Sequence, residues 1–184
     1  DAAGVVVTTG LKELRYNSGE AANNDLAFDI QVTNIEHYSA DIVITPSDLN
    51  EEYYYYIGYI DSKKKSMKPI DIANAAITEY LYYWDENGKL AIREPHTGVA
   101  DLTGYELNIA ETEYFIVAFS FEADPTYGTI INEETGEYGT NPGTITSAPV
   151  YVSFKTPEHG DAYNAEFKFK FTEVGPYDFT FEVE

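Results

Sequence analysis

The chain has 184 residues, 43% of them hydrophobic, and a formal net charge of −21 at pH 7. This length accommodates one domain with extensions, and the hydrophobic fraction excludes a chain that is disordered by composition. The strong negative charge repels nucleic acid and anionic lipid headgroups, so neither is expected as a partner. The absence of cysteine excludes disulfides, thiolate metal sites and cysteine nucleophiles. No apolar run approaches about 18 residues, so no membrane span is expected.

Two strands are predicted after residues 1–25, which we expect to form an N-terminal strand or linker. Apolar and polar residues alternate strictly in two neighbouring segments, whose apolar members are Phe28, Ile30 and Val32 and then Ala40, Ile42 and Ile44. Alternation with a period of two is typical of strands that are buried on one face. The turn-forming sequence PSDLN at residues 46–50 ends the second strand.

A third strand is predicted at residues 52–60, which carry five tyrosines distributed over both faces. Aromatic side chains on both faces indicate a central strand that is covered on both sides. Helical spacing follows in residues 69–84, where Ile70, Ala73, Ile77 and Leu81 recur on one face. The sequence DENG at residues 85–88 predicts the end of that helix.

Strands resume at residues 106–109 and 113–121, and Val150, Val152 and Phe154 predict a closing strand. Between them, residues 123–148 form a long excursion rich in Gly, Thr and Asn, with a hairpin expected around residues 134–136. Short strands separated by turns indicate an all-β protein, and a β-sandwich with the helix as an insertion is the best architecture.

A partial internal repeat is predicted, because a shift of about 139 residues places residues 28–44 on residues 167–183. Both copies interrupt two alternating segments with the same pattern, Thr-x-(Ile/Val)-x-x-Tyr. We therefore expect three units: the N-terminal strand or linker, a sandwich at residues 26–157, and residues 158–184 as a linker with the first two strands of a second, incomplete repeat.

No catalytic or metal-binding pattern is recognisable. His37, His96 and His159 fall in separate predicted loops without the spacing of a metal site, and neither a nucleophile elbow nor a phosphate-binding glycine motif is present. A glycosidase needs two carboxylates across a cleft, but chance pairs among 32 acidic residues carry no signal. The DENG segment resembles the start of a calcium loop, but Lys89 takes the place of the next ligand. We expect no enzyme activity, no metal and no cofactor.

Aromatic residues are the candidates for ligand contact, because an exposed flat ring stacks on a sugar or anchors a protein partner. The candidates are Tyr55, Trp84, Tyr127 and Tyr138. The alternative for a tyrosine within a strand is a buried, structural position. Tyr114 stands near the start of the penultimate strand, where sandwiches of this kind have a tyrosine corner, so its hydroxyl is predicted to bond the backbone a few residues upstream.

Five segments, in their order and spacing, resemble the fibronectin-III-like (immunoglobulin-like sandwich) modules of Bacteroidales surface lipoproteins. They are FDIQVTNI at residues 28–35, SADIVITPSD at 39–48, EYYYYI at 52–57, TEYFIVAF at 112–119 and VYVSFKT at 150–156. One stretch departs from the pattern: the usual Leu-x-Pro-Gly-Thr-x-Tyr is here LNIAETEY at residues 107–114, so the turn before this strand is expected to differ.

The resemblance implies a seven-strand-type sandwich with a helical insertion and an extracellular location on the outer-membrane surface, anchored through a lipidated residue upstream of this chain. It further implies a non-catalytic binding or spacer module for adhesion or glycan capture, whose partner is a protein or glycan at the cell surface. Two alternatives come from other classes. One is a filament subunit that self-associates through its terminal strands, and the other is a divergent hydrolase.

Overall fold

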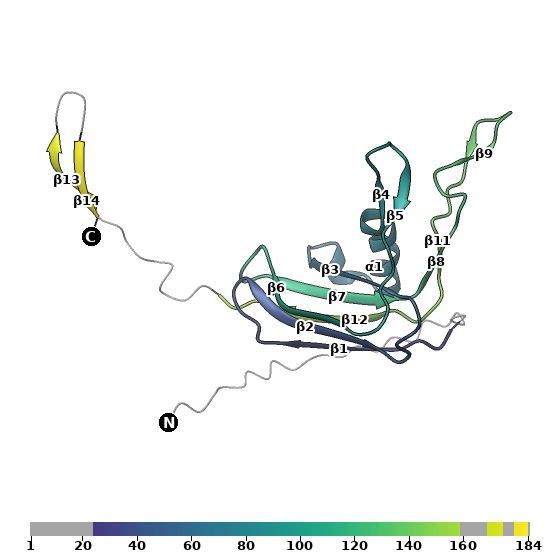
Figure 1. Cartoon of the computed structure of the whole chain (residues 1–184). Coiled ribbons are helices and arrows are strands. Elements are labelled where there is room, and N and C mark those ends of the chain that lie inside the picture. The colour runs from purple at the N-terminus through teal and green to yellow at the C-terminus, as the bar shows by residue number, and fades with distance from the viewer. Residues whose placement is uncertain (1–23, 159–168, 175–178, 184) are drawn as a thin grey trace.

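The computed structural model describes residues 24–158, 169–174 and 179–183, which are mostly β-strands in antiparallel sheets (Figure 1). Two three-stranded sheets form the body of the protein. The first has the order β1-β2-β6, with bounds Phe28–Thr33, Ser39–Pro46 and Ala100–Glu106. The second has the order β12-β7-β3, with bounds Val150–Lys155, Glu113–Phe119 and Tyr54–Tyr59. The expectation of a mostly-β protein is confirmed.

The first two strands pair as the alternation predicts. Ile30 lies opposite Ile44, and Val32 lies opposite Ile42, in an antiparallel ladder. The apolar residues of both strands are buried, whereas the residues between them are exposed or half-buried. A slip by one residue would turn all of these apolar side chains toward solvent, so their burial fixes the register.

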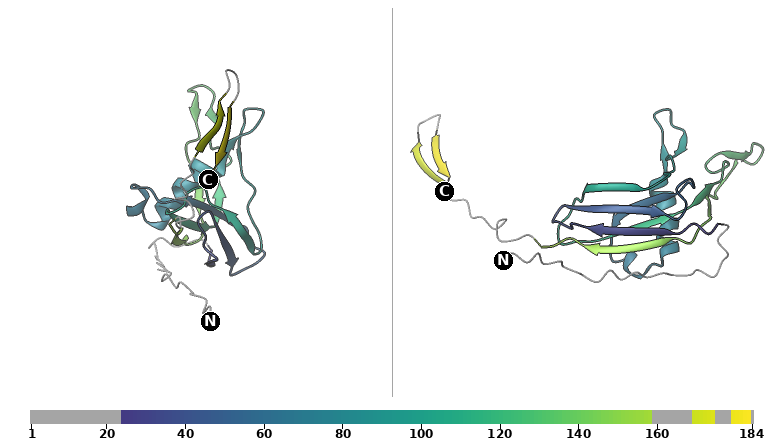
Figure 2. Two further views of the ribbon diagram at one scale, coloured as in Figure 1. Left: turned by 90° about the vertical axis from the view of Figure 1, so that its left-hand side faces the viewer. Right: turned by 60° about the horizontal axis from the view of Figure 1, so that its bottom comes forward.

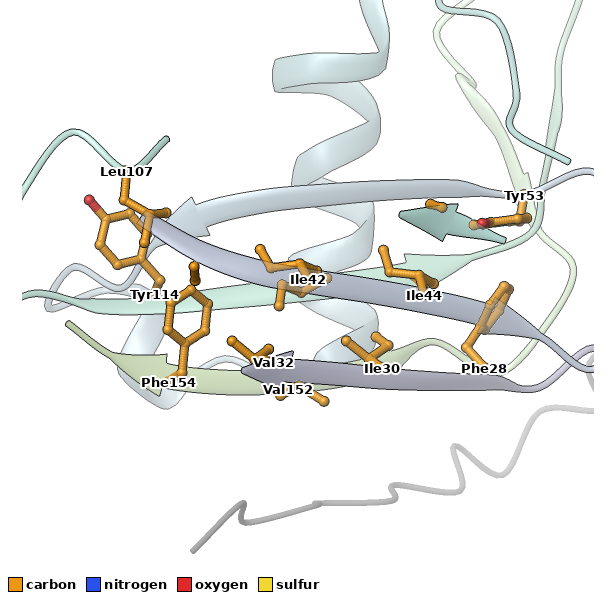
Figure 3. Close-up of a cluster of buried hydrophobic side chains, with 14 of the residues drawn as sticks. Phe28, Ile30, Val32, Ile42, Ile44, Tyr53, Leu107, Tyr114, Val152 and Phe154 are labelled. Carbon is orange, nitrogen blue, oxygen red and sulfur yellow. The ribbon is translucent and has the colours of Figure 1, made fainter. Parts of the chain in front are cut away.

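The inner faces of the two sheets enclose the main core (Figure 3). Both sheets contribute side chains, among them Phe28 and Ile44 from the first and Ile116 and Phe154 from the second. Burying a side chain of this size contributes about 1.5–3 kcal/mol relative to leaving it exposed. Two sheets that pack across one apolar layer form a sandwich-like arrangement.

A helix covers the outer face of the second sheet. This helix, α1 (Pro69–Ala76), continues as a π-helical turn, η2 (Ile77–Leu81), and both pack against β7 in a second core. Residues of β7 alternate between the two cores: Tyr114, Ile116 and Ala118 lie in the first, and Phe115, Val117 and Phe119 lie in the second. Because both faces of β7 are buried, its sequence EYFIVAF is a nearly continuous apolar run.

The third strand, β3, lies at the edge of its sheet, so the prediction of a central strand is wrong. It pairs with β7 on one side only, with Tyr55 opposite Ala118. Its aromatic residues occupy both faces because a core lies on each side: Tyr55 packs against the main core and Tyr54 against the helical one. Aromatic residues on both faces of a strand therefore indicate that a layer packs above it and another packs below it. They do not indicate that the strand has a neighbour on each side within the sheet.

The helical region ends at Leu81, earlier than the predicted boundary at residue 84. Tyr82–Trp84 form a strand, β4, that pairs with β5 (Leu90–Ile92). Residues 85–88 are therefore the turn of a hairpin. The helical spacing is real up to Leu81, which is fully buried against β7, whereas the three aromatic residues that follow prefer an extended strand.

The strand predicted at residues 106–109 lies earlier, because β6 ends at Glu106. Leu107 still donates its N–H to the carbonyl oxygen of Tyr38, but Ile109 is held by the side chain of Tyr114 instead of a neighbouring strand. The predicted strand at residues 113–121 is divided into β7 and β8 (Phe121–Ala123).

The excursion predicted at residues 123–148 contains short strands of its own. β8 pairs with β11 (Gly143–Ile145), and β9 (Ile130–Asn132) pairs with β10 (Glu137–Tyr138). This second pair surrounds the hairpin turn that the sequence predicts at residues 134–136. A 3-10 turn, η1 (Lys64–Ser66), joins β3 to α1.

The C-terminal strands β13 (Phe169–Val174) and β14 (Phe179–Val183) pair with each other in a separate two-stranded sheet. Phe169 lies opposite Val183, and Phe171 lies opposite Phe181. A shift of 139 residues carries these two pairs onto Ile30–Ile44 and Val32–Ile42 of the first hairpin. The second hairpin thus repeats the pairing of the first over these positions, before a bulge between Phe171 and Glu173.

The described chain enters and leaves the body at opposite ends (Figure 2). Asn24 donates its N–H to the carbonyl oxygen of Thr146 at 3.0 Å, whereas Lys155 pairs with Glu113 at the far end of β7. Residues 1–23 of the predicted N-terminal segment, and 159–168, 175–178 and 184 of the predicted C-terminal unit, lie outside the described residues. No helix in the described part is both long and apolar enough to cross a membrane.

Candidate functional site

Two arms project from the same end of the body (Figure 1). The short arm, residues 82–92, is the β4–β5 hairpin and lies in sequence between the helix and β6. The long arm, residues 121–145, runs from β8 to β11 and lies between β7 and β12. Three of the four aromatic candidates for ligand contact lie in the arms: Trp84 in the short arm, and Tyr127 and Tyr138 in the long arm.

Asp85 builds the turn of the short arm. Its Oδ1 accepts hydrogen bonds from the N–H groups of Asn87 at 2.9 Å and Lys89 at 2.8 Å, and Gly88 has a φ of +71°. A side-chain acceptor followed by a glycine in the left-handed region satisfies a three-residue hairpin loop. The turn therefore keeps Tyr82 to Trp84 extended, with side chains that alternate between the two faces of the arm.

Two glycines allow the long arm to pack closely. A Cβ atom on Gly128 would lie 2.5 Å from Cδ2 of Leu90 in the short arm, and one on Gly139 would lie 2.2 Å from the carbonyl oxygen of Thr126. The N–H of Gly128 donates to the carbonyl oxygen of Gly139 at 2.9 Å. A side chain on Gly128 would therefore meet the short arm, whereas one on Gly139 would meet the backbone of the long arm itself.

Tyr82 also joins the two arms. Its ring centroid lies 4.7 Å from that of Tyr127, and its hydroxyl donates to the carbonyl oxygen of Pro142 at 2.5 Å. Aromatic pairs at such separations contribute about 0.5–1.5 kcal/mol beyond the burial of their area. Desolvation on burial raises the pKa of Tyr82, so its hydroxyl stays protonated and able to donate at neutral pH.

The space between the arms is an open cleft of about 430 Å³, which we call the inter-arm cleft. Tyr82, Tyr83 and Trp84 line it from the short arm, and Tyr127 lines it from the long arm. Trp84 is 69% exposed and Tyr83 is 44% exposed. Large flat rings that are held by a strand yet open to solvent are suited to stacking against a ligand.

A second cleft of about 480 Å³, the tyrosine cleft, adjoins the first at Tyr83, which lines both. Its other aromatic lining residues are Tyr53, Tyr54 and Tyr55 near and in β3, Tyr80 in η2, and His96. Aromatic residues line both clefts, which share Tyr83.

Arg93 supplies a positive charge to the tyrosine cleft. Its Cζ lies 4.4 Å from the ring centroid of Tyr80 and 5.7 Å from that of Tyr83, and its Nε donates to the carbonyl oxygen of Tyr80 at 3.0 Å. Stacking on two rings holds the guanidinium in a fixed orientation. Within the described part of the chain Arg93 makes no ion pair, so its two terminal nitrogens remain available on an exposed side chain.

His96 lies in the wall of the same cleft. Its ring meets Tyr53 edge-on at 5.3 Å and Tyr55 at 6.0 Å, and its backbone exchanges hydrogen bonds with that of Tyr53. Its buried Nε2 has no hydrogen-bond partner among the described residues. An unsatisfied buried nitrogen costs about 1–3 kcal/mol, which makes this atom the least satisfied polar group of the cleft.

Three tyrosines of the tyrosine cleft, Tyr53, Tyr54 and Tyr55, have pKa values raised above the ordinary value. Desolvation on burial raises the pKa of Tyr53 to about 12, and it also raises the pKa of Tyr54 and Tyr55. The Tyr53 hydroxyl already donates to the carbonyl oxygen of Gly98 at 3.0 Å. Besides these neutral tyrosines, the cleft is lined by one cation, Arg93, and by the carboxylate of Glu94.

The structure brings together three of the four candidate contact residues. Trp84 and Tyr127 line the inter-arm cleft, and Tyr55 lines the tyrosine cleft. Tyr138, in β10, is 55% exposed and lines neither cleft.

Several lining residues were not among the sequence candidates, including Tyr80, Tyr83, Arg93 and His96. If residues 82–84 are interpreted as a strand, their three consecutive aromatic side chains identify Tyr83 as a further candidate for ligand contact. The pairing of β4 with β5 brings Arg93 to the tyrosine cleft. A single arginine in the sequence has no pattern from which this position could be predicted.

Tyr114 lies apart from the clefts. Its hydroxyl donates to the carbonyl oxygen of Ile109 at 3.1 Å and accepts the N–H of the same residue at 2.9 Å. The ring is 5% exposed and stacks on Phe154. The sequence predicts a hydrogen bond from Tyr114 to the backbone a few residues upstream, and this bond is present at Ile109. It closes the part of the lengthened turn that runs from Ile109 to Tyr114.

Among the described residues, no three His, Asp or Glu side chains gather closely enough to hold a metal ion. Neither the DENG turn at residues 85–88 nor the glutamates of the long arm form such a group. Comparison of the chain with protein-family models, with curated proteins and with solved structures finds no match.

Proposed function

We propose that this protein is a non-catalytic binding module of the cell surface that holds a glycan against the aromatic residues that line its two clefts. The observation that carries the proposal is Trp84, 69% exposed in the wall of a cleft to which Tyr83 and Tyr127 also contribute. Sugar rings present flat C–H faces that pack on such rings, and their hydroxyls bond to tyrosine hydroxyls. Two adjoining clefts offer room for more than one sugar unit.

The strand order supports assignment to the immunoglobulin and fibronectin-III-like sandwiches. Sheets β1-β2-β6 and β12-β7-β3 correspond to the A-B-E and G-F-C strands of that fold. The helix and short arm then occupy the connection between strands C and E, and the long arm occupies the F–G connection, one of the binding loops in antibody variable domains. By the same argument, β13 and β14 are the first two strands of a second repeat, since their register is that of β1 and β2.

Location on an outer membrane surface, through a lipidated residue upstream, belongs to the same proposal. The resemblance of the five sequence segments to Bacteroidales surface lipoproteins supports it, together with the acidic, cysteine-free composition. Residues 26–157 would then present the two arms outward for adhesion or glycan capture.

A glycan array followed by titration calorimetry tests the proposal. Trp84→Ala and Tyr127→Ala are expected to weaken binding of the selected glycan by tenfold or more each, since stacked aromatic residues contribute about 1–3 kcal/mol to such contacts. Tyr138→Ala is the matched control, because Tyr138 is an exposed aromatic residue of the same arm outside both clefts. Binding that is lost equally in all three variants, or unaffected by Trp84→Ala, would contradict the proposed site.

A second candidate function is a filament subunit joined by exchange of terminal strands. The observation that favours it is the separate two-stranded sheet of β13 and β14, because an isolated hairpin of this size is only marginally stable in water. Light scattering at increasing protein concentration separates the two candidates. Growth in mass with concentration supports the filament, and a constant monomer mass supports the binding module.

A further inference from the structure

We infer that the glycan bound at the tyrosine cleft carries a carboxylate, as uronic acids do, and that Arg93 is the residue that recognises it. This inference rests on the proposed function and specifies its ligand class. It starts from the one cationic side chain of the cleft, which the rings of Tyr80 and Tyr83 orient.

The geometry of Arg93 leaves its carboxylate-binding edge unused. Nε donates to the carbonyl oxygen of Tyr80, and Cζ lies over the rings of Tyr80 and Tyr83. The terminal nitrogens have no partner within the described residues, and they present the paired N–H groups that match a carboxylate. A structural arginine on the surface of a protein with 32 acidic residues would be expected to pair with one of them, and Arg93 pairs with none of those that the structure describes.

The rest of the cleft suits the remainder of such a sugar. Tyr83, the residue shared by both clefts, stands beside Arg93 with an exposed ring, so a ring stacked on it would hold its carboxylate near the guanidinium. Tyrosine hydroxyls that remain protonated donate to carboxylate and hydroxyl oxygens without adding charge. Among the residues that the structure describes, His96 adds the one buried side-chain nitrogen that lacks a hydrogen-bond partner.

The charges around Arg93 define the selectivity. Glu94 lines the same cleft and opposes an anionic ligand, and the net charge of −21 repels anions at long range. At about 0.15 M ionic strength the Debye length is about 8 Å, so contact with Arg93 is screened less than repulsion by distant carboxylates. Recognition therefore depends on the local contact, and Glu94 limits its strength.

The test uses the full chain and matched probes: oligomers of uronic acids, and the same oligomers with their carboxyl groups methyl-esterified. The measured quantity is the ratio of the two affinities, which is insensitive to a partial loss of folded protein. For the native chain we expect the acid to bind at least tenfold more tightly than the ester. Arg93→Gln should bring the ratio close to one, Arg93→Lys should leave an intermediate ratio, and Glu94→Gln should raise it.

Each outcome decides the inference. Equal affinity for acid and ester in the native chain, or a ratio that Arg93→Gln leaves unchanged, overturns the role of Arg93 while the proposed glycan site stands. A preference for the ester overturns it in the same way. If neither probe nor any neutral glycan binds, the proposed function fails together with the inference.

Discussion

Gly128 of the long arm faces Leu90 of the short arm so closely that a Cβ atom would lie 2.5 Å from Cδ2 of the leucine. Its φ of +71° lies in the left-handed region, which independently favours glycine. Glycine at this position therefore lets the Leu90 side chain lie against the backbone of the long arm, and both residues line the inter-arm cleft.

Gly128→Ala should destabilise the protein and open the inter-arm cleft. A left-handed backbone in a non-glycine residue costs about 1–3 kcal/mol, and the contact with Leu90 adds to it. Gly136→Ala is the matched control, because Gly136 has a φ of +69° and no neighbour within 4 Å of its added Cβ. Urea unfolding should show a loss in both variants, whereas the emission of Trp84, the single tryptophan, should change only in Gly128→Ala. Two results would contradict this prediction. One is Trp84 emission that stays unchanged in Gly128→Ala, and the other is a double variant, Gly128→Ala with Leu90→Ala, that does not regain the native emission.

Tyr114→Phe should lower the free energy of unfolding by about 1–3 kcal/mol. Removing the hydroxyl leaves the N–H of Ile109 without its partner, while the carbonyl oxygen of Ile109 keeps only the Thr156 hydroxyl at 3.3 Å. The ring and its stacking on Phe154 remain, so packing is unaffected. Tyr138→Phe, at an exposed position, serves as the reference in the same chemical denaturation experiment. Equal stability of the two variants would mean that water replaces the Tyr114 bond at no cost.

Stability should fall in alkaline solution as the buried tyrosines ionise. The pKa of Tyr53 is about 12 in the folded protein against 10.0 for the free side chain. Its contribution is fully present below pH 10 and is lost as the pH rises toward 12, because the unfolded chain releases its proton first. The pKa values of Tyr54, Tyr55, Tyr105 and Tyr151 are raised in the same direction by burial. Following tyrosinate absorbance and unfolding together tests this, and Tyr53→Phe should make the alkaline loss shallower. A midpoint of unfolding that is the same at pH 9 and pH 11 would contradict it.

A chain that ends at Pro157 should remain folded, because both cores are assembled from described residues between Leu26 and Phe154. Its unfolding midpoint in urea should match that of the full chain within error. Hydrogen exchange on the full chain gives the complementary measurement: the amides of β13 and β14 should be protected only while the hairpin packs on a partner, since two strands alone are marginal. A truncated chain that fails to fold would show that residues 158–184 belong to the same cooperative unit.

Local patterns predicted the body of the protein well because its register depends on local alternation. The burial of Ile30, Val32 and Ile42 can be derived from period-two spacing alone. The repeat at residues 167–183 predicted the pairing of Phe171 with Phe181 for the same reason. Such patterns act between neighbouring residues and need no knowledge of the rest of the fold.

The candidate site was only partly predictable because it depends on contacts between segments distant in sequence. Residues 82–84 continue the helical spacing, and only pairing with β5 shows that they are a strand. The clefts depend on Gly128 meeting Leu90 and on Arg93 lying between Tyr80 and Tyr83. None of these contacts has a periodic signature, so aromatic composition identified Trp84 and Tyr127 but not their neighbours.

Entry at one end of the body and exit at the other have a mechanical consequence. A pull applied between Asn24 and Lys155 acts along the axes of β1 and β12 and loads both ladders in shear. All the hydrogen bonds of a ladder then resist together, whereas a pull across a ladder would break them one at a time. The short arm branches from the connection between β3 and β6, which lies outside this path. The body is therefore built to resist tension applied between its two ends.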